Sequence, residues 1–160
     1  MAGLDGIYNF LPLSERLATA GQPTADELAG VGAAGYEVVV NLLPSDSPYA
    51  LPDEAEIVAR LGLEYVALPV DWQHPRPADA ERFFDVLDAN AGRRVFAHCA
   101  ANMRVSAFVS LYRVLRQGMA PAEAQRDLHR IWTPNATWQA FLRAMTEGTG
   151  GPTRPEGLPE

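Results

Sequence analysis

The hydrophobic residues of this chain follow two alternating periods, one typical of strands and one typical of helices. Short apolar runs rich in β-branched residues predict three strands, at 37–42, 63–70 and 94–97. Each run is apolar over most of its length, so we expect all three strands to lie in the interior of a sheet that is covered on both faces. The pattern therefore predicts an α/β fold in which a central mixed or parallel sheet is flanked by helices.

Apolar stripes at helical spacing predict six helices. Three of them lie between strands, where Thr24 can cap the first and Pro52 and Pro77 open the next two. Three more follow the last strand and are separated by turn residues. The expected helices cover 25–35, 53–62, 78–90, 105–118, 120–132 and 135–148. The C-terminal half of the chain is thus expected to be helical throughout.

The length of the chain limits how it is organised. A chain of 160 residues is long enough to bury one hydrophobic core, and we expect a single domain over residues 1–147. Residues 148–160 combine glycine, proline and charge without an apolar stripe. They are predicted to form a flexible C-terminal tail.

Charge and cysteine content restrict the expected partners and location. The formal net charge is −7 and the basic residues are scattered, so we expect no nucleic-acid partner. The N-terminus lacks the parts of a secretory leader, and no window is apolar enough to span a membrane. One cysteine precludes an internal disulfide and fits a reducing compartment. We therefore expect a soluble, cytoplasmic protein without a membrane partner, whose oligomeric state the sequence does not indicate.

The segment VFAHCAANMRVSAF, residues 95–108, contains the candidate chemistry. Cys99 follows a predicted buried strand, and Arg104 falls in the first turn of the next helix. The backbone N–H groups of a strand-to-helix loop attract anions, and the same field lowers the pKa of a cysteine thiol. An arginine adds a planar fork of donors that suits phosphate oxygens. Ala100, Ala101, Asn102, Met103 and Arg104 are thus predicted to bind phosphate around a nucleophilic Cys99.

This loop resembles that of the cysteine-based protein tyrosine and dual-specificity phosphatases, which reads His-Cys, five residues, Arg, then Ser or Thr. The motifs GQPT (21–24), VVNL (39–42) and LPVDW (68–72) precede it in the order found in a small bacterial branch of these enzymes. The resemblance covers about residues 17–142. It implies a three-layer phosphatase fold and hydrolysis of a phosphomonoester through a phosphocysteine intermediate.

The same resemblance implies a role for individual residues. Cys99 would attack phosphorus, Arg104 would hold the phosphoryl oxygens, and Asp71 in the loop PVDWQHPRP would be the general acid. His98 would support the loop by hydrogen bonding. No cofactor and no metal ion are expected. The substrate would be a phosphorylated protein or a phosphorylated small molecule.

The loop departs from the family pattern because four residues, not five, separate Cys99 from Arg104. If the loop is shortened, Arg104 keeps its place and Val105 takes the hydroxyl position. If the loop keeps its length, Ser106 takes that position, although Ser106 is also a candidate helix cap. We favour the shortened loop because it aligns the longer stretch of helix. The family's glycines are missing, so we expect Asn102 to adopt a left-handed conformation and the activity to be weak.

Two other classes of function remain open at this point. Rhodanese-type sulfurtransferases also use a cysteine loop between a strand and a helix, often with four residues between Cys and Arg or Thr. Their loops usually contain glycine and further basic residues, which AANM lacks. The third class is a catalytically inactive module that keeps the loop as a phosphate-binding or partner-binding pocket.

Overall fold

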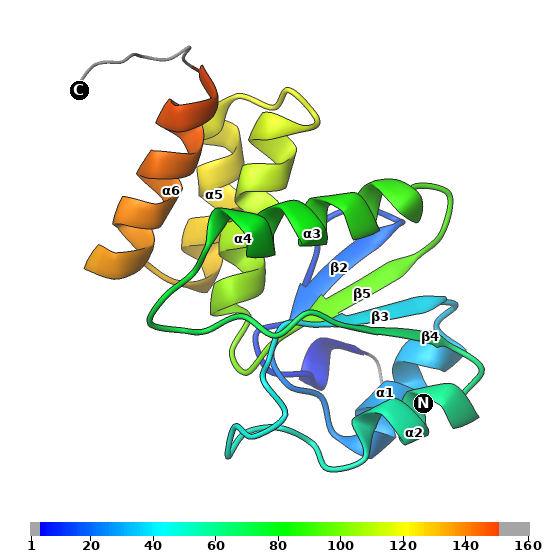
Figure 1. The fold of residues 1–160 in the computed structure, drawn as a ribbon. Helices are drawn as coiled ribbons and strands as arrows, with labels where there is room; N and C mark the ends of the chain where they lie inside the picture. The colour runs from blue at the N-terminus through cyan, green and yellow to red at the C-terminus, as the bar shows by residue number, and fades with distance from the viewer. Residues whose placement is uncertain (1–3, 151–160) are drawn as a thin grey trace.

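The computed structural model describes residues 4–150 and forms a five-stranded sheet packed between helices (Figure 1). After the 3-10 helix η1 (Leu4–Gly6), strands and helices alternate up to β5, and three helices follow. The strands are β1 (Leu11–Pro12), β2 (Leu17–Ala20), β3 (Val38–Asn41), β4 (Glu64–Ala67) and β5 (Val95–His98). The helices are α1 (Ala25–Ala33), α2 (Glu54–Arg60), α3 (Pro77–Ala89), α4 (Met103–Leu115), α5 (Pro121–Ile131) and α6 (Ala136–Gly150).

The sheet has the order β1-β2-β5-β3-β4, with β5 at its centre. β1 runs antiparallel to β2, and the other three pairings are parallel. The register places His98, the last residue of β5, opposite Ala20 on one side and Asn41 on the other. The predicted mixed α/β fold is confirmed, and the carboxyl ends of three parallel strands meet at one edge of the sheet.

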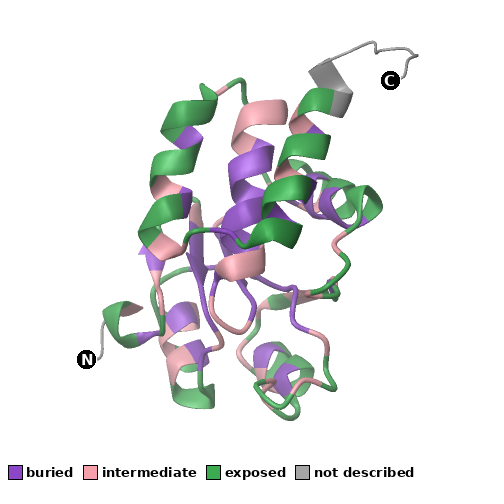
Figure 2. Ribbon diagram, turned by 90° about the vertical axis from the view of Figure 1, so that its left-hand side faces the viewer, coloured by how far each residue is buried: buried purple, intermediate pink, exposed green. Residues whose placement is uncertain are grey.

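Helices cover both faces of the sheet, which gives the three layers expected. α1 and α2 lie on one face, and the C-terminal helices with α3 lie on the other (Figures 1 and 2). Because neighbouring residues of a strand point to opposite faces, Val95 and Ala97 join the larger core beneath α3 and α4, whereas Phe96 joins the smaller core beneath α1. β5 is buried along its whole length, so it is a rigid support for the loop that follows it.

One expectation about the strands is wrong, and two strands were missed. The run at 63–70 forms β4, but β4 lies at the edge of the sheet, pairs only with β3 and is at best half-buried. Its apolar composition reflects packing of one face against α2, not burial on both faces. β1 and β2 were not predicted at all, because LATA is short and carries one β-branched residue among small ones.

Several helix start signals act as expected. Thr24 caps α1 in a capping box, in which its hydroxyl accepts from the Glu27 N–H and the Glu27 carboxylate accepts from the Thr24 N–H. Pro77 is the first residue of α3.

α6 continues to Gly150, and residues 151–160 of the predicted tail lie outside the described residues. The proposed end of the domain therefore remains a prediction.

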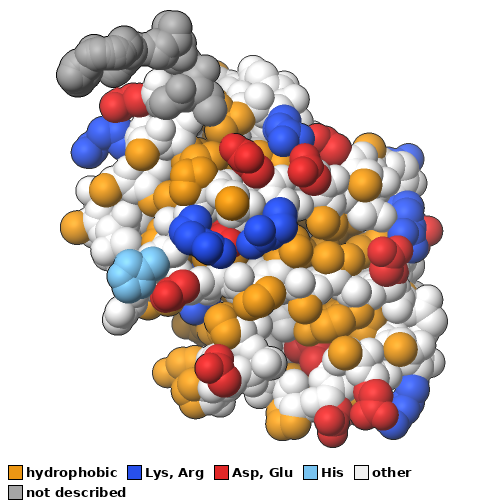
Figure 3. Space-filling view, in the orientation of Figure 1, with side chains coloured by type: hydrophobic (Ala, Val, Ile, Leu, Met, Phe, Trp, Pro, Cys, Tyr) orange, Lys and Arg blue, Asp and Glu red, His pale blue; other side chains and the backbone are white. Residues whose placement is uncertain are grey.

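Charged side chains on the face seen in Figure 3 are mixed, with arginines beside acidic residues. Arg76 and Arg82 both pair with the buried Asp79 carboxylate, at 3.1 and 2.8 Å.

None of the helices within residues 4–150 combines the length and apolarity needed to span a lipid bilayer.

Candidate active site

Cys99 is the first residue after the central strand β5, as predicted, and it is wholly buried. Its N–H donates to the Ala20 carbonyl at 3.3 Å, which continues the pairing of β5 with β2 for one more residue. α4 begins four residues later, with Asn102 as its N-cap and Arg104 in its first turn. The cysteine therefore sits at the base of a short loop that connects a buried strand to the helix.

Two carbonyl groups of this loop are held on its outer side. The Ala100 carbonyl accepts from the Gln22 N–H at 2.9 Å, and the Ala101 carbonyl accepts from Asn9 Nδ2 at 3.0 Å. In a trans peptide the C=O and the following N–H point in opposite directions. The N–H group of Ala101 must therefore point away from Gln22, and the N–H group of Asn102 points away from Asn9, toward the Ala20 carbonyl in the bridge between Gly21 and Ala101.

The N–H groups of residues 100, 101, 103, 104 and 105 have no hydrogen-bond acceptor within the described part of the chain, whereas an isolated antiparallel bridge between Gly21 and Ala101 brings the Asn102 N–H to the Ala20 carbonyl. The next N–H, that of Ser106, donates to the Asn102 carbonyl at 2.9 Å and begins the regular bonding of α4. The N–H groups of residues 103–105 lie in the first turn of α4, where unpaired donors are expected at any helix start, and the other two belong to the loop. Four of the five predicted phosphate-binding residues, all but Asn102, thus have an unpaired backbone donor, which suits an anion.

Asn102 takes the left-handed conformation that the shortened loop requires, with φ 65° and ψ 7°. Its side chain is wholly buried, and Nδ2 donates to the Asn9 carbonyl and to Thr19 Oγ1, each at 2.9 Å. The backbone conformation was predicted from the residue type, but these two bonds were not. They tie the turn of the loop to the N-terminal segment and to β2.

A glycine in the neighbouring segment allows this close packing. A Cβ atom at Gly21 would lie 2.6 Å from the Ala100 carbonyl oxygen, which is closer than real Cβ contacts allow. Only glycine at this position lets the chain after β2 approach the cysteine loop and donate to it from Gln22.

Arg104 links the cysteine loop to the segment that carries Asp71. Its Nε donates to the Val70 carbonyl at 3.0 Å, and its guanidinium lies 5.3 Å from the ring centre of Trp72. No carboxylate of the described residues pairs with it. Its remaining N–H donors line two pockets, of about 230 and 770 Å³, and are free to bind an anion.

Asp71 lines the larger of these pockets together with Arg104. Val70 is fixed by Arg104, and the Trp72 carbonyl accepts from Trp138 Nε1 at 2.9 Å, so the backbone is anchored on both sides of Asp71. The carboxylate is 63% exposed and accepts from the Gln73 N–H at 2.9 Å, while His74 Nδ1 lies 3.3 Å away. The Gln73 N–H, with a smaller contribution from His74, holds the pKa of Asp71 below its ordinary value.

His98 lies behind the loop and is wholly buried. Its Nε2 is 2.5 Å from Glu54 Oε2, and its Nδ1 is 3.2 Å from the Cys99 carbonyl oxygen. Gln22 Nε2 donates to the other carboxylate oxygen of Glu54 at 2.8 Å. The sequence singled out His98 but missed Glu54, Gln22 and Asn9. A glutamate in the first turn of a helix looks like an ordinary solvated residue, and no pattern marks Asn9. Gln22 lies in the motif GQPT, but no role was predicted for it.

Ser106 has a different environment from the one expected. Its hydroxyl donates to the Met103 carbonyl and accepts from Trp132 Nε1, each at 3.1 Å. The N-cap of α4 is Asn102, so the interpretation of Ser106 as the cap is wrong. The hydroxyl instead connects the first turn of α4 to the end of α5.

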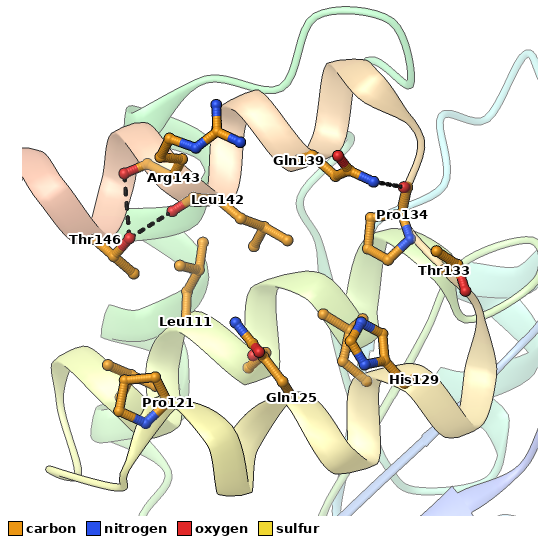
Figure 4. A pocket seen from close by; sticks show the side chains of 13 residues that line it. Leu111, Pro121, Gln125, His129, Thr133, Pro134, Gln139, Leu142, Arg143 and Thr146 are labelled. Carbon is orange, nitrogen blue, oxygen red and sulfur yellow. Dashed lines mark hydrogen bonds between the residues drawn. The ribbon is translucent and has the colours of Figure 1, made fainter.

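Another pocket, of about 350 Å³, lies in the helical layer between α4, α5 and α6 (Figure 4). Leu111, Gln125 and Leu142 are among its lining residues, and it contains none of the predicted site residues.

Among residues 4–150 no three His, Cys, Asp or Glu side chains gather closely enough to hold a metal ion.

Comparison with known proteins identifies the family. The family model described as "DSP-PTPase phosphatase fused to NAD+ Kinase" matches residues 11–143. The chain belongs to this family. This agrees with the resemblance to dual-specificity and tyrosine phosphatases that the sequence indicated.

Three similar proteins describe the family further. A crystal structure of "Putative phosphatase (DUF442)" from Shewanella putrefaciens is 36% identical, covers 90% of this chain and 95% of that one, and superposes with a TM-score of 0.80. Pseudomonas aeruginosa TpbA, solved in complex with pTyr, shares the fold at 18% identity, 92% and 95% coverage and a TM-score of 0.63. "Beta-lactamase hydrolase-like protein" from Xylella fastidiosa is 31% identical over 71% of this chain. The chain spans only about a quarter of that protein, 27% of its length.

Proposed function

We propose that the chain hydrolyses phosphomonoesters through a phosphocysteine intermediate on Cys99. The observations that carry this proposal are the unpaired N–H groups of residues 100, 101 and 103–105, which follow Cys99, and Arg104, which has no carboxylate partner among the described residues. Such an array stabilises the negative charge of a phosphoryl group more strongly than it stabilises a neutral ligand. Membership of a phosphatase family supports the same chemistry.

In the first step the Cys99 thiolate attacks phosphorus, an S–P bond forms and the ester P–O bond breaks. Asp71 gives a proton to the departing oxygen, and the alcohol or phenol leaves. In the second step water attacks phosphorus, Asp71 takes one of its protons, the S–P bond breaks and inorganic phosphate leaves. Arg104 and the loop N–H groups hold the three phosphoryl oxygens in both steps. The proton that Asp71 takes from water returns it to the acid form for the next first step.

The outer hydrogen bonds of the loop explain how four residues can serve in place of five. Gln22 and Asn9 hold two carbonyls outward, and Asn102 makes the left-handed turn without a glycine. We infer that the remaining unpaired N–H groups can still bind one phosphoryl group although the loop is short. We therefore propose a working enzyme with modest turnover and not an inactive module.

The entrance to the site supports a phosphorylated side chain or small molecule as substrate. The smaller pocket at Arg104 is bounded by Tyr49 and Trp72, whose rings suit an aromatic or extended apolar leaving group. TpbA, which shares the fold, has been solved with pTyr. These observations support phosphotyrosine and aryl phosphates as the first substrates to test.

Hydrolysis of an aryl phosphate by the wild type, Cys99→Ser and Asp71→Asn tests the proposal, with Asp26→Asn in the exposed first turn of α1 as a matched control. We expect Cys99→Ser to abolish turnover, Asp71→Asn to lower it and Asp26→Asn to leave it unchanged. Sulfur transfer from thiosulfate to cyanide is measured in parallel. Cysteine-dependent sulfur transfer without phosphate release would contradict the proposal, as would tight phosphate binding without turnover.

A further inference from the structure

A second arginine, Arg76, lines the larger pocket that contains Asp71 and Arg104. Arg76 directly precedes α3, and its side chain is 67% exposed in the wall of this pocket of about 770 Å³. Pockets of such a volume enclose whole small-molecule ligands, and one phosphoryl group at Arg104 fills only a small part of it. The proposed reaction therefore leaves Arg76 and most of the pocket without a role.

The buried Asp79 holds the Arg76 side chain in place. Its carboxylate is 2% exposed and accepts from Arg76 Nε at 3.3 Å and from Arg76 Nη2 at 3.1 Å. It also accepts from the Arg76 backbone N–H at 3.2 Å. A long exposed side chain ordinarily samples many rotamers, so these contacts remove conformational entropy before any ligand binds. The Arg76 guanidinium is thus preorganised at the pocket.

The cluster around Asp79 keeps a net positive charge. Arg82, one turn after Asp79 in α3, donates to the same carboxylate from Nη2 at 2.8 Å, so two guanidinium groups share one carboxylate. Arg82 does not line the pocket. Nη1 of Arg76 has no hydrogen-bond acceptor within the described part of the chain. The cluster therefore keeps one positive charge, and Arg76 keeps free N–H donors, in the pocket wall.

Arg76 lies near the residues proposed to act in the reaction. Arg104, Asp71 and Arg76 line one pocket. The pKa of Arg76 is raised, mainly by its hydrogen bond to Asp79, and the charge of Asp71 adds to this rise. The Asp71 carboxylate is thus within electrostatic reach of the Arg76 guanidinium. A molecule whose phosphoryl group binds Arg104 can therefore extend past Asp71 to Arg76.

The acidic residues of the pocket restrict where a second anion can bind. Asp79 is neutralised by its two arginines, and the proposed first step needs Asp71 in its neutral acid form. Asp46, in the loop between β3 and α2, pairs with no cationic side chain of the described residues and repels anions from its part of the pocket. The wall formed by Arg76 is the part that attracts them.

We propose that Arg76 binds a second anionic group of the substrate while Cys99 and Arg104 bind the phosphoryl group that is transferred. The substrates are then small phosphomonoesters that carry another phosphate or a carboxylate. A planar guanidinium with free N–H donors suits both groups. The inference rests on the proposed function, because it places the first phosphoryl group at the cysteine loop.

Calorimetry with phosphonates tests the proposal in the Cys99→Ser variant, which binds ligands without forming an intermediate on sulfur. The probes are alkane bisphosphonates of increasing chain length, the carboxyalkyl phosphonates and the alkyl monophosphonates of the same lengths. At the length that spans the two arginines, we expect a doubly anionic probe to bind about tenfold more tightly than the monophosphonate. The tighter of the two doubly anionic probes shows whether the second group is a phosphate or a carboxylate. Equal affinities at every length would overturn the proposal.

The variants Arg76→Gln and Arg82→Gln separate direct contact from net charge. Each removes one positive charge from the same cluster, but only Arg76 lines the pocket. In Arg76→Gln, Arg82 and the backbone N–H of residue 76 still bond to Asp79, so the fold is expected to survive. We expect Arg76→Gln to remove the preference for two anionic groups, Arg76→Lys to restore part of it and Arg82→Gln to retain most of it. An equal loss in the two glutamine variants, or an equal weakening of the singly and doubly anionic probes, would overturn the proposal.

Failure of this inference and failure of the proposed function give different results. An Arg76-dependent preference for two anionic groups, in a chain that does not turn over aryl phosphates, would refute the proposed function and leave the second anion site standing. Turnover of aryl phosphates together with equal affinities for singly and doubly anionic probes would refute this inference alone.

Discussion

Arg104 Nε donates a hydrogen bond of 3.0 Å to the carbonyl oxygen of Val70, the residue directly before Asp71. The residue expected to hold the phosphoryl group thereby also fixes the segment that carries the expected general acid. The guanidinium lies against the ring of Trp72 as well, so both neighbours of Asp71 contact it. Binding of phosphate by Arg104 and placement of Asp71 are therefore coupled through one side chain.

Substitution Arg104→Lys tests this coupling. Lysine keeps the positive charge but cannot bond to Val70 and present a planar pair of donors to phosphate at the same time. We expect kcat/KM for an aryl phosphate to fall by about 100-fold. Arg143→Lys, in the helical layer away from the site, is expected to leave kcat/KM unchanged. Equal activity of Arg104→Lys and the wild type would remove Arg104 from phosphate binding.

The pKa of Asp71 makes a prediction about pH dependence. The pKa is lowered, first by the Gln73 N–H and then by His74, so the carboxyl group loses its proton at a lower pH than an ordinary aspartate. Because the first step needs the protonated form, kcat should fall as the pH rises through this pKa. His74→Ala should raise the pKa toward the ordinary value and move the alkaline limb of the kcat profile to higher pH.

The Gln73 N–H remains in His74→Ala, so the alkaline limb of the kcat profile should move only part of the way. In Asp71→Asn the alkaline limb should disappear, because the titrating group is gone, and kcat should fall by about 100-fold. An alkaline limb that persists unchanged in Asp71→Asn would assign the proton transfer to another group.

Gly21 is predicted to be essential for the shape of the loop. In Gly21→Ala the new Cβ would meet the Ala100 carbonyl oxygen at 2.6 Å, and the loop must shift outward or lose its bond to the Gln22 N–H. We expect weaker binding of inorganic phosphate, measured by calorimetry, together with lower turnover. Gly92→Ala is the matched control, since nothing lies within 4 Å of its Cβ position. Equal phosphate affinity in both variants would contradict this account of the loop.

Asn102 contributes both a backbone conformation and two side-chain bonds, and two substitutions separate them. Asn102→Gly keeps the left-handed conformation and loses the bonds to Asn9 and Thr19, whereas Asn102→Ala loses both. We expect the free energy of unfolding in urea to decrease from wild type to Asn102→Gly, and to decrease by about 1 kcal/mol more in Asn102→Ala. The reverse order for the two variants would show that backbone strain at residue 102 is unimportant.

The sequence indicated the central part of the site because its signals are local. A buried strand, one cysteine, a helix start and an arginine follow each other within ten residues, and Asn102 is the loop residue best suited to a positive φ. The position of Asp71 came from resemblance to a family. In the structure its carboxylate accepts a hydrogen bond from the Gln73 N–H within its own loop.

The supporting contacts could not be predicted because each joins distant segments through side chains of common type. Glu54 and His98 meet across 44 positions, and Asn9 reaches Ala101 across 92. The spacing of apolar residues along α2 does not indicate that Glu54 is buried. The edge position of β4 could not be predicted from the sequence either, because an edge strand and an interior strand can have similar apolar runs.

The central claim is that the phosphoryl group passes through Cys99, and trapping the intermediate tests it most directly. Asp71→Asn is mixed with an aryl phosphate, whose good leaving group needs little acid assistance, so the first step proceeds while water attack lacks its base. The reaction is quenched, and intact-protein and peptide mass spectrometry locate the added phosphoryl group. The account predicts one phosphoryl group on Cys99 and none in the Asp71→Asn, Cys99→Ser double variant. Turnover with the phosphoryl group on another side chain, or with Cys99 never modified, would contradict it.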